Sequence, residues 1–150
     1  MKKKILIILA IVLLAIQFVR PQKNINTEQT NINQIPDNVL KDLKVACYDC
    51  HSNNTIYPWY SNIQPVAWWL NKHIENGKRH LNFDETLSKK DYEEIIEVIE
   101  ENEMPLFSYT IIHRDAKLSD TQKKSITDWA TQAKINAPEG AQHEHSEREH

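Results

Sequence analysis

The stretch Cys47-Tyr48-Asp49-Cys50-His51 contains both cysteines of the chain, with a histidine directly after the second. This is the spacing of a c-type haem attachment site. Two thiols on one helical turn can add to the two vinyl groups of a haem, and the next imidazole can bind the iron. The pattern predicts one covalent haem c, with thioether bonds from Cys47 and Cys50 and a proximal iron ligand from His51.

Two other uses of a cysteine pair fit the sequence less well. A redox C-x-x-C pair is typical of a thioredoxin-like βαβ unit, which the sequence pattern does not contain. A zinc site needs two further thiolate or imidazole ligands at short spacing. An exported thiol oxidoreductase therefore remains an alternative only if no haem is attached.

The N-terminal segment has the pattern of a targeting sequence. Lysines at positions 2–4 precede an apolar run, residues 5–19, whose only polar member is Gln17. As a helix this run spans about 22 Å, which is less than the roughly 30 Å hydrocarbon core of a bilayer. No A-x-A cleavage pattern and no lipoprotein cysteine follows it. The sequence favours an uncleaved signal anchor over a removed signal peptide.

The charges predict where the rest of the chain lies. Lysines before the apolar run leave the N-terminus in the cytoplasm and everything after Pro21 outside. Haem attachment suits a bacterial periplasm with a maturation system, so we expect the periplasmic side of the inner membrane. Residues 1–20 contain four basic residues and no acid, which leaves 14 basic against 21 acidic residues, a formal −7. Such an acidic exported domain is a poor binder of nucleic acid.

Composition divides the chain into four segments. Residues 1–20 are the signal anchor or signal peptide, and residues 21–35 read as a polar tether. Residues 36–134 are the haem-binding domain, and residues 135–150 are a tail predicted to be disordered. The tail contains His143, His145 and His150. Only two glycines in 150 residues argue against a turn-rich β fold, so we expect an all-α fold of about four helices around the haem.

Four helices can be placed from their boundaries and apolar faces. The first begins at Pro36 and leads directly into the cysteine motif, and the last should pack on it. The second runs from Pro65 to Gly77, with proline in the first turn and glycine just past the end. The other two begin at capping boxes that start with Ser88 and Ser119. The apolar faces are Val39, Leu40, Leu43 and Ala46; Val66, Trp69, Leu70, His73 and Ile74; Tyr92, Ile95, Ile96 and Ile99; and Ile126, Trp129, Ala130 and Ala133.

Three residues are candidates for the sixth iron ligand. Met104 is the only methionine after the initiator, and a thioether is a soft donor that raises the reduction potential. Its alternative role is core filling. His73 is the fallback ligand, although a histidine on an apolar helix face is more often a hydrogen-bonded core residue. His113 is the third candidate.

Three further segments have a haem-related interpretation and an ordinary one. The basic loop Lys78-Arg79-His80 can pair with haem propionates or be a solvated loop. The aromatic run at residues 56–60 can wall the ring edge or anchor a loop in a small core. The acidic face at residues 93–101 can be solvated or dock a basic redox partner.

The order of these features resembles a class I c-type cytochrome. It is more closely similar to the small bacterial haem-binding domain family of cytochrome-like proteins, and the similarity covers about residues 36–134. The loop with Trp68 and Trp69 departs from a compact cytochrome c. The stretches that carry the resemblance are Cys47-Tyr48-Asp49-Cys50-His51-Ser52-Asn53, Tyr57-Pro58-Trp59-Tyr60, Leu81-Asn82-Phe83 and Met104-Pro105-Leu106.

The resemblance implies a small class I cytochrome c-like bundle with covalent haem c on Cys47 and Cys50 and His51 as axial ligand. The residues and the resemblance together predict a periplasmic one-electron carrier with a redox partner protein, bound to the membrane through its N-terminal helix. The alternative is a haem-based sensor or ligand-binding module, whose sixth position is vacant or held by a displaceable His73. No segment gathers a nucleophile, a base and an orienting group, so we do not expect an enzyme.

Overall fold

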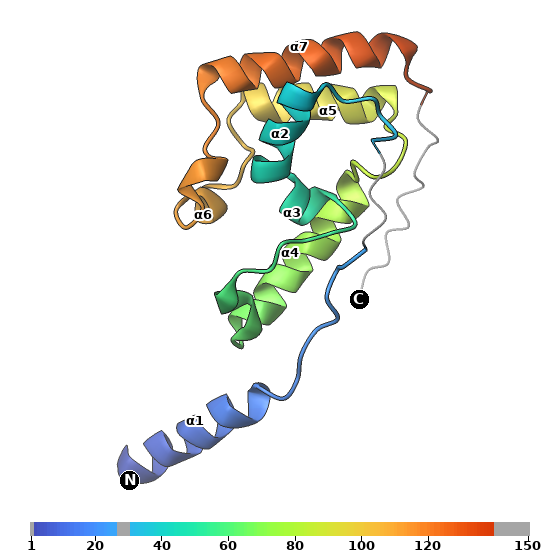
Figure 1. Cartoon of the computed structure of the whole chain (residues 1–150). Helices are drawn as coiled ribbons and strands as arrows, with labels where there is room; N and C mark the ends of the chain where they lie inside the picture. The colour runs from blue at the N-terminus through green and yellow to red at the C-terminus, as the bar shows by residue number, and fades with distance from the viewer. Residues whose placement is uncertain (1, 27–30, 140–150) are drawn as a thin grey trace.

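The computed structural model describes residues 2–26 and 31–139, and every regular element within them is helical (Figure 1). The elements are α1 (Lys2–Ile16), α2 (Asp37–Ala46), α3 (Tyr48–His51), the 3-10 helix η1 (Trp59–Asn62), α4 (Val66–His80), α5 (Lys89–Glu100), α6 (Phe107–Thr110), the 3-10 helix η2 (Arg114–Ala116) and α7 (Asp120–Asn136). The expected all-α class is confirmed. The first residues of the predicted tail continue α7, whereas residues 140–150, with all three tail histidines, and residues 27–30 of the predicted tether lie outside the described residues.

The helices α5 and α7 lie antiparallel and side by side (Figure 1). Both begin at the predicted capping boxes, in which Ser88 and Ser119 each accept a hydrogen bond from the backbone N–H three residues further on. The start of α5 is joined to the end of α7, because the Lys89 N–H donates to the Pro138 carbonyl oxygen at 3.0 Å. Satisfied N-terminal donors at both helices stabilise this pair.

The hydrophobic core lies where α2 crosses the α5–α7 pair. Leu43 of α2 and Ile126 of α7 are fully buried, and the rings of Tyr92 and Trp129 meet edge to face at 5.6 Å. The predicted packing of the last helix on the first is confirmed, although α5 is the larger partner of α7. The buried apolar side chains of this core are Ile35, Val39, Leu43, Ala46, Tyr48, Phe83, Leu87, Tyr92, Ile95, Ile99, Leu118, Ile126, Trp129 and Ala130.

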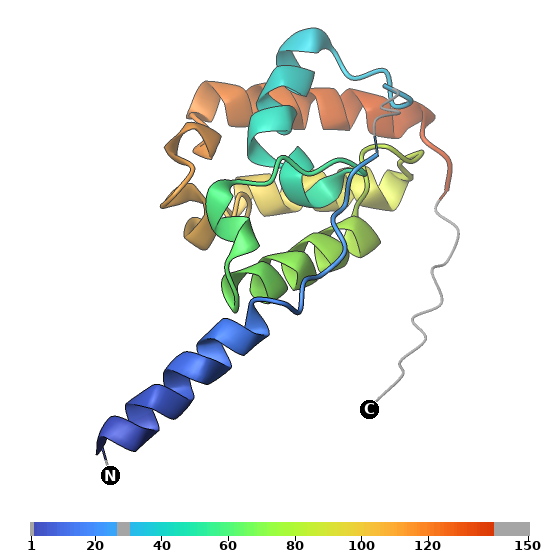
Figure 2. The ribbon, with the colours of Figure 1, turned by 60° about the horizontal axis from the view of Figure 1, so that its bottom comes forward.

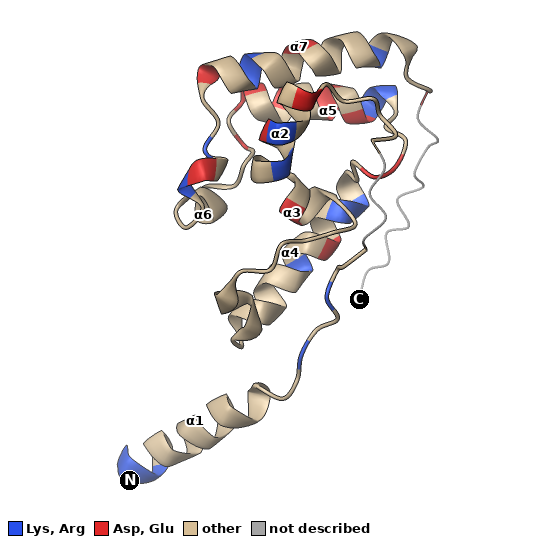
Figure 3. Cartoon of the chain, viewed as in Figure 1, with Lys and Arg blue, Asp and Glu red and all other residues tan. Residues whose placement is uncertain are grey.

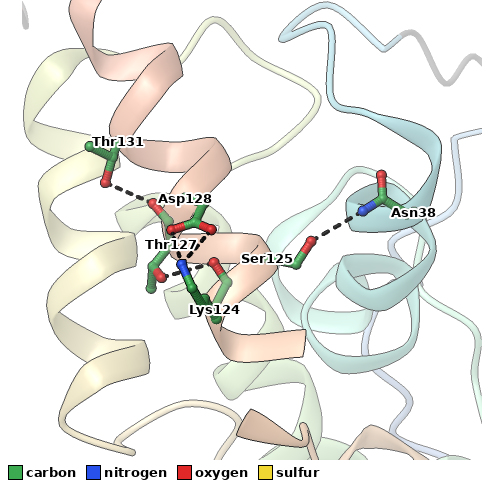
Figure 4. Close-up of polar contacts among 6 residues, drawn as sticks. All are labelled: Asn38, Lys124, Ser125, Thr127, Asp128 and Thr131. Carbon is green, nitrogen blue, oxygen red and sulfur yellow. Dashed lines mark hydrogen bonds and ion pairs between the residues drawn. The ribbon is translucent and has the colours of Figure 1, made fainter. Parts of the chain in front are cut away.

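Figure 4 shows polar contacts of α7 at the edge of this core. Asn38 of α2 donates to the Ser125 hydroxyl of α7 at 3.1 Å. Lys124 and Asp128 form an exposed ion pair within α7 at 2.7 Å. Exposed ion pairs contribute about 0–1 kcal/mol, so burial of apolar area supplies most of the stability of the core.

Gly77 lies inside α4, which continues to His80, and not past the helix end as the sequence pattern predicted. A Cβ atom at this position would lie 2.7 Å from the backbone carbonyl oxygen of Cys50. The absence of a side chain therefore lets α4 pack closely on α3 at the cysteine motif. Glycine serves both helix ends and close approaches of backbone, and the sequence alone does not distinguish them.

The buried face of α4 also differs from the prediction. Ala67 and Ile74 are the buried residues of this helix, whereas Val66 and Trp69 are 38% and 50% exposed. The close approach at Gly77 explains the difference, because it turns the helix face that carries positions 67, 74 and 77 towards α3. Of the predicted face, Ile74 is confirmed as buried, whereas the large side chains of Val66 and Trp69 remain at the surface.

The helix α1 extends away from the domain with its apolar side chains exposed (Figures 1 and 2). Beyond its N-terminal lysines it carries no charge (Figure 3). Within the described residues, no helix has both the length and the apolar character to cross a membrane. At the end of α1, Gln17 and Gln64 exchange hydrogen bonds of 3.0 and 3.3 Å, which join α1 to the start of α4.

The chain that follows α1 is bonded to the domain. The carbonyl oxygen of Val19 accepts hydrogen bonds from the Gln64 side chain at 2.7 Å and from the Trp68 indole at 3.0 Å. The Asn24 side chain donates to the Ser52 carbonyl oxygen at 2.9 Å. The start of the segment predicted as a tether therefore lies against the loops around the cysteine motif, and α1 is attached to the domain at more than one point.

Candidate functional site

Cys47, Cys50 and His51 line one cavity of about 280 Å³, and Met104 lines the same cavity. Cys47 ends α2 and α3 begins at the next residue, so the two helices together present the cysteine motif. The C-terminal half of α4 and residues 104–109 form the other walls. A smaller cavity of about 60 Å³ shares several of these residues, Met104 among them, and continues between α2, α5 and α7. Residues far apart in sequence thus meet at one site.

Both cysteines are free thiols of intermediate burial. Desolvation raises the pKa of Cys47 to about 12 and that of Cys50 to about 11, with smaller contributions from nearby negative groups. The thiols are therefore neutral, whereas a thiol oxidoreductase works through a thiolate of lowered pKa. In the part of the chain that the structure describes, no group of three or more His, Cys, Asp or Glu residues is placed to hold a metal ion. Neither the redox pair nor the zinc site gains support.

His51 is oriented by the loop after α4. Its Nδ1 lies 3.0 Å from the carbonyl oxygen of Leu81. A carbonyl oxygen only accepts, so Nδ1 carries the proton and Nε2 keeps its lone pair. Burial lowers the pKa of His51, although the hydrogen bonds to backbone oxygens oppose this effect. The imidazole is thus neutral and in the tautomer that binds a metal through Nε2, with its ring at 75° to that of Phe83.

Met104 lies on the segment between α5 and α6. The backbone N–H groups of Glu103 and Met104 both donate to the carbonyl oxygen of Val98, at 2.9 and 3.2 Å. These bonds turn the chain back over the last turn of α5 and bring Met104 to both cavities. The sequence prediction that Met104 accompanies the cysteine motif therefore agrees with its position, while iron ligation by Met104 remains a prediction.

The two histidine alternatives lie in different surroundings. His73 lines the larger cavity, stacks on Trp69 at a ring distance of 4.1 Å, and has Nδ1 2.8 Å from the Trp69 carbonyl oxygen. It is close enough to the cysteine motif to stay a fallback ligand. His113 does not line either cavity. Its Nε2 lies 2.5 Å from the Tyr60 hydroxyl, so that nitrogen already has a partner.

The other proposed haem contacts are only partly brought to the site. Lys78 donates to the Asn24 side chain at 2.7 Å, and Arg79 donates to that of Asn76. The predicted loop is wrong, because Lys78, Arg79 and His80 form the last turn of α4, and of the three His80 alone lines the cavity. Among the aromatic run, Trp59 is 77% exposed and none of its neighbours lines the cavity, so these residues do not wall it.

Three residues that line the cavity were not singled out as site residues by the sequence pattern. Glu94 belongs to the acidic face of α5 but borders the cavity. Gly77 does so through the close approach of α4 to Cys50. Tyr109 borders it from α6, where its hydroxyl donates to Asp49 Oδ2 at 2.8 Å. A charged residue in an acidic run and a tyrosine in a loop carry no local signal of such a role, since only the tertiary fold brings them there.

The residues present fit a covalently bound porphyrin. They provide two neutral thiols three positions apart, an imidazole oriented by the Leu81 carbonyl oxygen, a thioether, and a largely apolar wall around one cavity. The all-α fold and this donor set define a helical domain of the kind that holds a haem.

A protein-family model described as a haem-binding domain matches residues 11–132. The chain belongs to this family, and it is a haem-binding protein. The match begins inside α1 and ends in α7, so it includes the bonded connection as well as the cavity. No similar protein was found among those of curated function, nor any similar chain among solved structures.

Proposed function

We propose that this protein holds a single haem c through thioether bonds from Cys47 and Cys50 and transfers single electrons. The observation that carries the proposal is the meeting of both thiols, His51 and Met104 at one cavity. Bound haem supplies the one-electron couple of its iron.

Each residue has a distinct role in the proposal. His51 is the proximal ligand, and the Leu81 carbonyl oxygen fixes its tautomer and ring orientation. Met104 is the distal ligand, whose soft sulfur favours reduced iron and raises the reduction potential. The apolar walls keep water away and strengthen this preference. If His51 and Met104 both held the iron, electron transfer would be favoured over binding of small ligands.

We also propose a place for the protein, at the periplasmic side of a bacterial inner membrane with α1 as its anchor. The apolar residues of α1 are exposed, and three lysines precede them. Trp68, which is 38% exposed, donates to the Val19 carbonyl oxygen just after α1, and tryptophan is enriched at membrane–water interfaces. A redox partner would then be a membrane or periplasmic protein.

The test is to express the full chain together with a cytochrome maturation system. Wild type should gain the mass of one haem and keep haem colour on a denaturing gel. Cys47→Ala combined with Cys50→Ala should carry none, and Cys47→Ser alone should retain one attachment point. The reduced and oxidised spectra should interconvert in a one-electron titration. A wild-type chain that carries no covalent haem would rule the proposal out.

The same preparation tests the sensor alternative. His73 lines the cavity together with Met104, so a displaceable sixth ligand is the specific competing arrangement. Rapid binding of carbon monoxide to the reduced wild-type protein would favour the ligand-binding function. Slow or absent binding would favour the electron carrier.

A further inference from the structure

We propose that Asp49 and Tyr109 form a clasp that holds the Met104 segment closed over the cavity, so that the two are positioning residues for the sixth ligand. The inference rests on the proposed function, because it concerns how Met104 is kept in place. Asp49 stands between the two cysteines of the motif, and Tyr109 lies five positions after Met104. Their hydrogen bond of 2.8 Å therefore ties the attachment helix α3 directly to α6.

The carboxylate of Asp49 is itself held in place. Its Oδ1 accepts the backbone N–H of Ile56 at 3.0 Å, and its backbone carbonyl oxygen accepts the Thr55 hydroxyl at 2.7 Å. The loop after α3 thus fixes one carboxylate oxygen and leaves the other to accept from Tyr109. A hydrogen bond to a charged acceptor in a partly buried site is stronger than one between neutral groups.

The ring of Tyr109 is supported from its other side. It stacks on His113 with a ring distance of 4.3 Å and an angle of 12°. His113 in turn meets the Tyr60 hydroxyl at 2.5 Å. This arrangement accounts for the position of His113, the histidine that the cavity does not use. His113 packs against the ring of Tyr109, which reaches from α6 to the cysteine motif.

The segment between Met104 and Tyr109 has few other attachments. The N–H of Met104 is held by the Val98 carbonyl oxygen, and the following backbone bonds are local to α6. Leu106 and Phe107 are 37% and 80% exposed, so they contribute little burial. The segment is therefore held at one end by α5 and at the other by the clasp, and loss of the clasp frees the end that carries Tyr109.

The test compares Tyr109→Phe with Tyr57→Phe in the full chain. Both remove one hydrogen-bonded hydroxyl, but the Tyr57 hydroxyl accepts from the Asn24 N–H, away from α6. Tyr109→Phe should raise the amide exchange rates of residues 104–110 by about tenfold or more, the factor expected for a lost hydrogen bond to a charged group. Tyr57→Phe should leave them unchanged.

The haem-loaded protein gives the second readout. Tyr109→Phe should weaken the charge-transfer band of a methionine–iron bond and speed carbon monoxide binding by about tenfold, because the methionine leaves more often. Asp49→Asn removes the charge and leaves one acceptor oxygen for the two hydrogen bonds of Asp49, so it should show a partial effect, whereas Asp49→Ala should behave like Tyr109→Phe.

The two readouts separate the two proposals. Unchanged amide exchange in Tyr109→Phe overturns the clasp whether or not haem is attached. Raised exchange in a wild-type background that carries no haem leaves the clasp standing as a contact and overturns only the electron-transfer function. Raised exchange with an unaltered methionine band overturns the positioning role.

Discussion

At the scale of single residues, the cavity is best understood through the partners of its functional atoms. The Leu81 carbonyl oxygen decides which nitrogen of His51 carries the proton, and Phe83 packs on the imidazole. The Phe83 N–H donates back to the His51 carbonyl oxygen at 2.8 Å. Leu81 and Phe83 therefore fix the orientation of the His51 imidazole, next to the second cysteine. This orientation could not be predicted from the sequence, because it depends on contacts thirty residues apart.

Replacement of Met104 by alanine tests the sixth ligand at the residue scale. We expect Met104→Ala to abolish the methionine–iron charge-transfer band and to lower the reduction potential, because the soft donor that favours reduced iron is lost. Redox titration and the oxidised spectrum measure both effects. His73→Ala is the matched control and should leave band and potential unchanged. A band lost in His73→Ala and kept in Met104→Ala would reverse the assignment.

At the scale of elements, the sequence predicted helix starts better than helix faces. The capping boxes at Ser88 and Ser119 are confirmed, because a cap is a local exchange of hydrogen bonds. The cysteine motif and Met104 were also found, since their chemistry is distinctive. The buried face of α4 was predicted only in part, with Ile74 right and Ala67 missed, since this face is set by a close approach of backbone at Gly77. The Asp49–Tyr109 contact was missed for the same reason, since it joins elements far apart in the chain.

Gly77→Ala separates the two interpretations of this glycine. In a free helix the change would stabilise by about 0.5–1 kcal/mol. Here the added Cβ would lie 2.7 Å from the Cys50 carbonyl oxygen, and overpacking of this kind costs about 1–3 kcal/mol. We expect a net loss of unfolding free energy in urea titrations. Lys72→Ala, an exposed change in the same helix, should stay within about 0.5 kcal/mol of wild type. A more stable Gly77→Ala protein would contradict the close packing of α3 and α4.

At the scale of the whole molecule, the distribution of apolar surface is uneven. The domain buries its apolar side chains between α2, α5 and α7, while α1 exposes nearly all of its own. An exposed apolar helix of this length needs a covering surface. A membrane would provide that surface if α1 is the proposed anchor.

The anchor is tested by fractionating cells that produce the full chain. We expect the protein to stay with the membranes through high salt and an alkaline wash and to be released by detergent, because apolar burial and not charge retains it. Mass spectrometry of the released protein should find residues 1–20 intact. Recovery from the soluble periplasmic fraction with a shortened N-terminus would instead identify a cleaved signal peptide.

The hydrogen bonds that join Gln17 to Gln64 and Val19 to Trp68 affect how redox partners would reach the domain. An electron carrier on a long flexible linker can move between two distant partners. A domain that is hydrogen-bonded to its own anchor helix keeps one orientation relative to that helix. With α1 in a membrane, the domain would keep a fixed orientation, and its electron donors and electron acceptors would have to reach it by diffusion along the bilayer. Its cavity would always face them from the same side and at the same height.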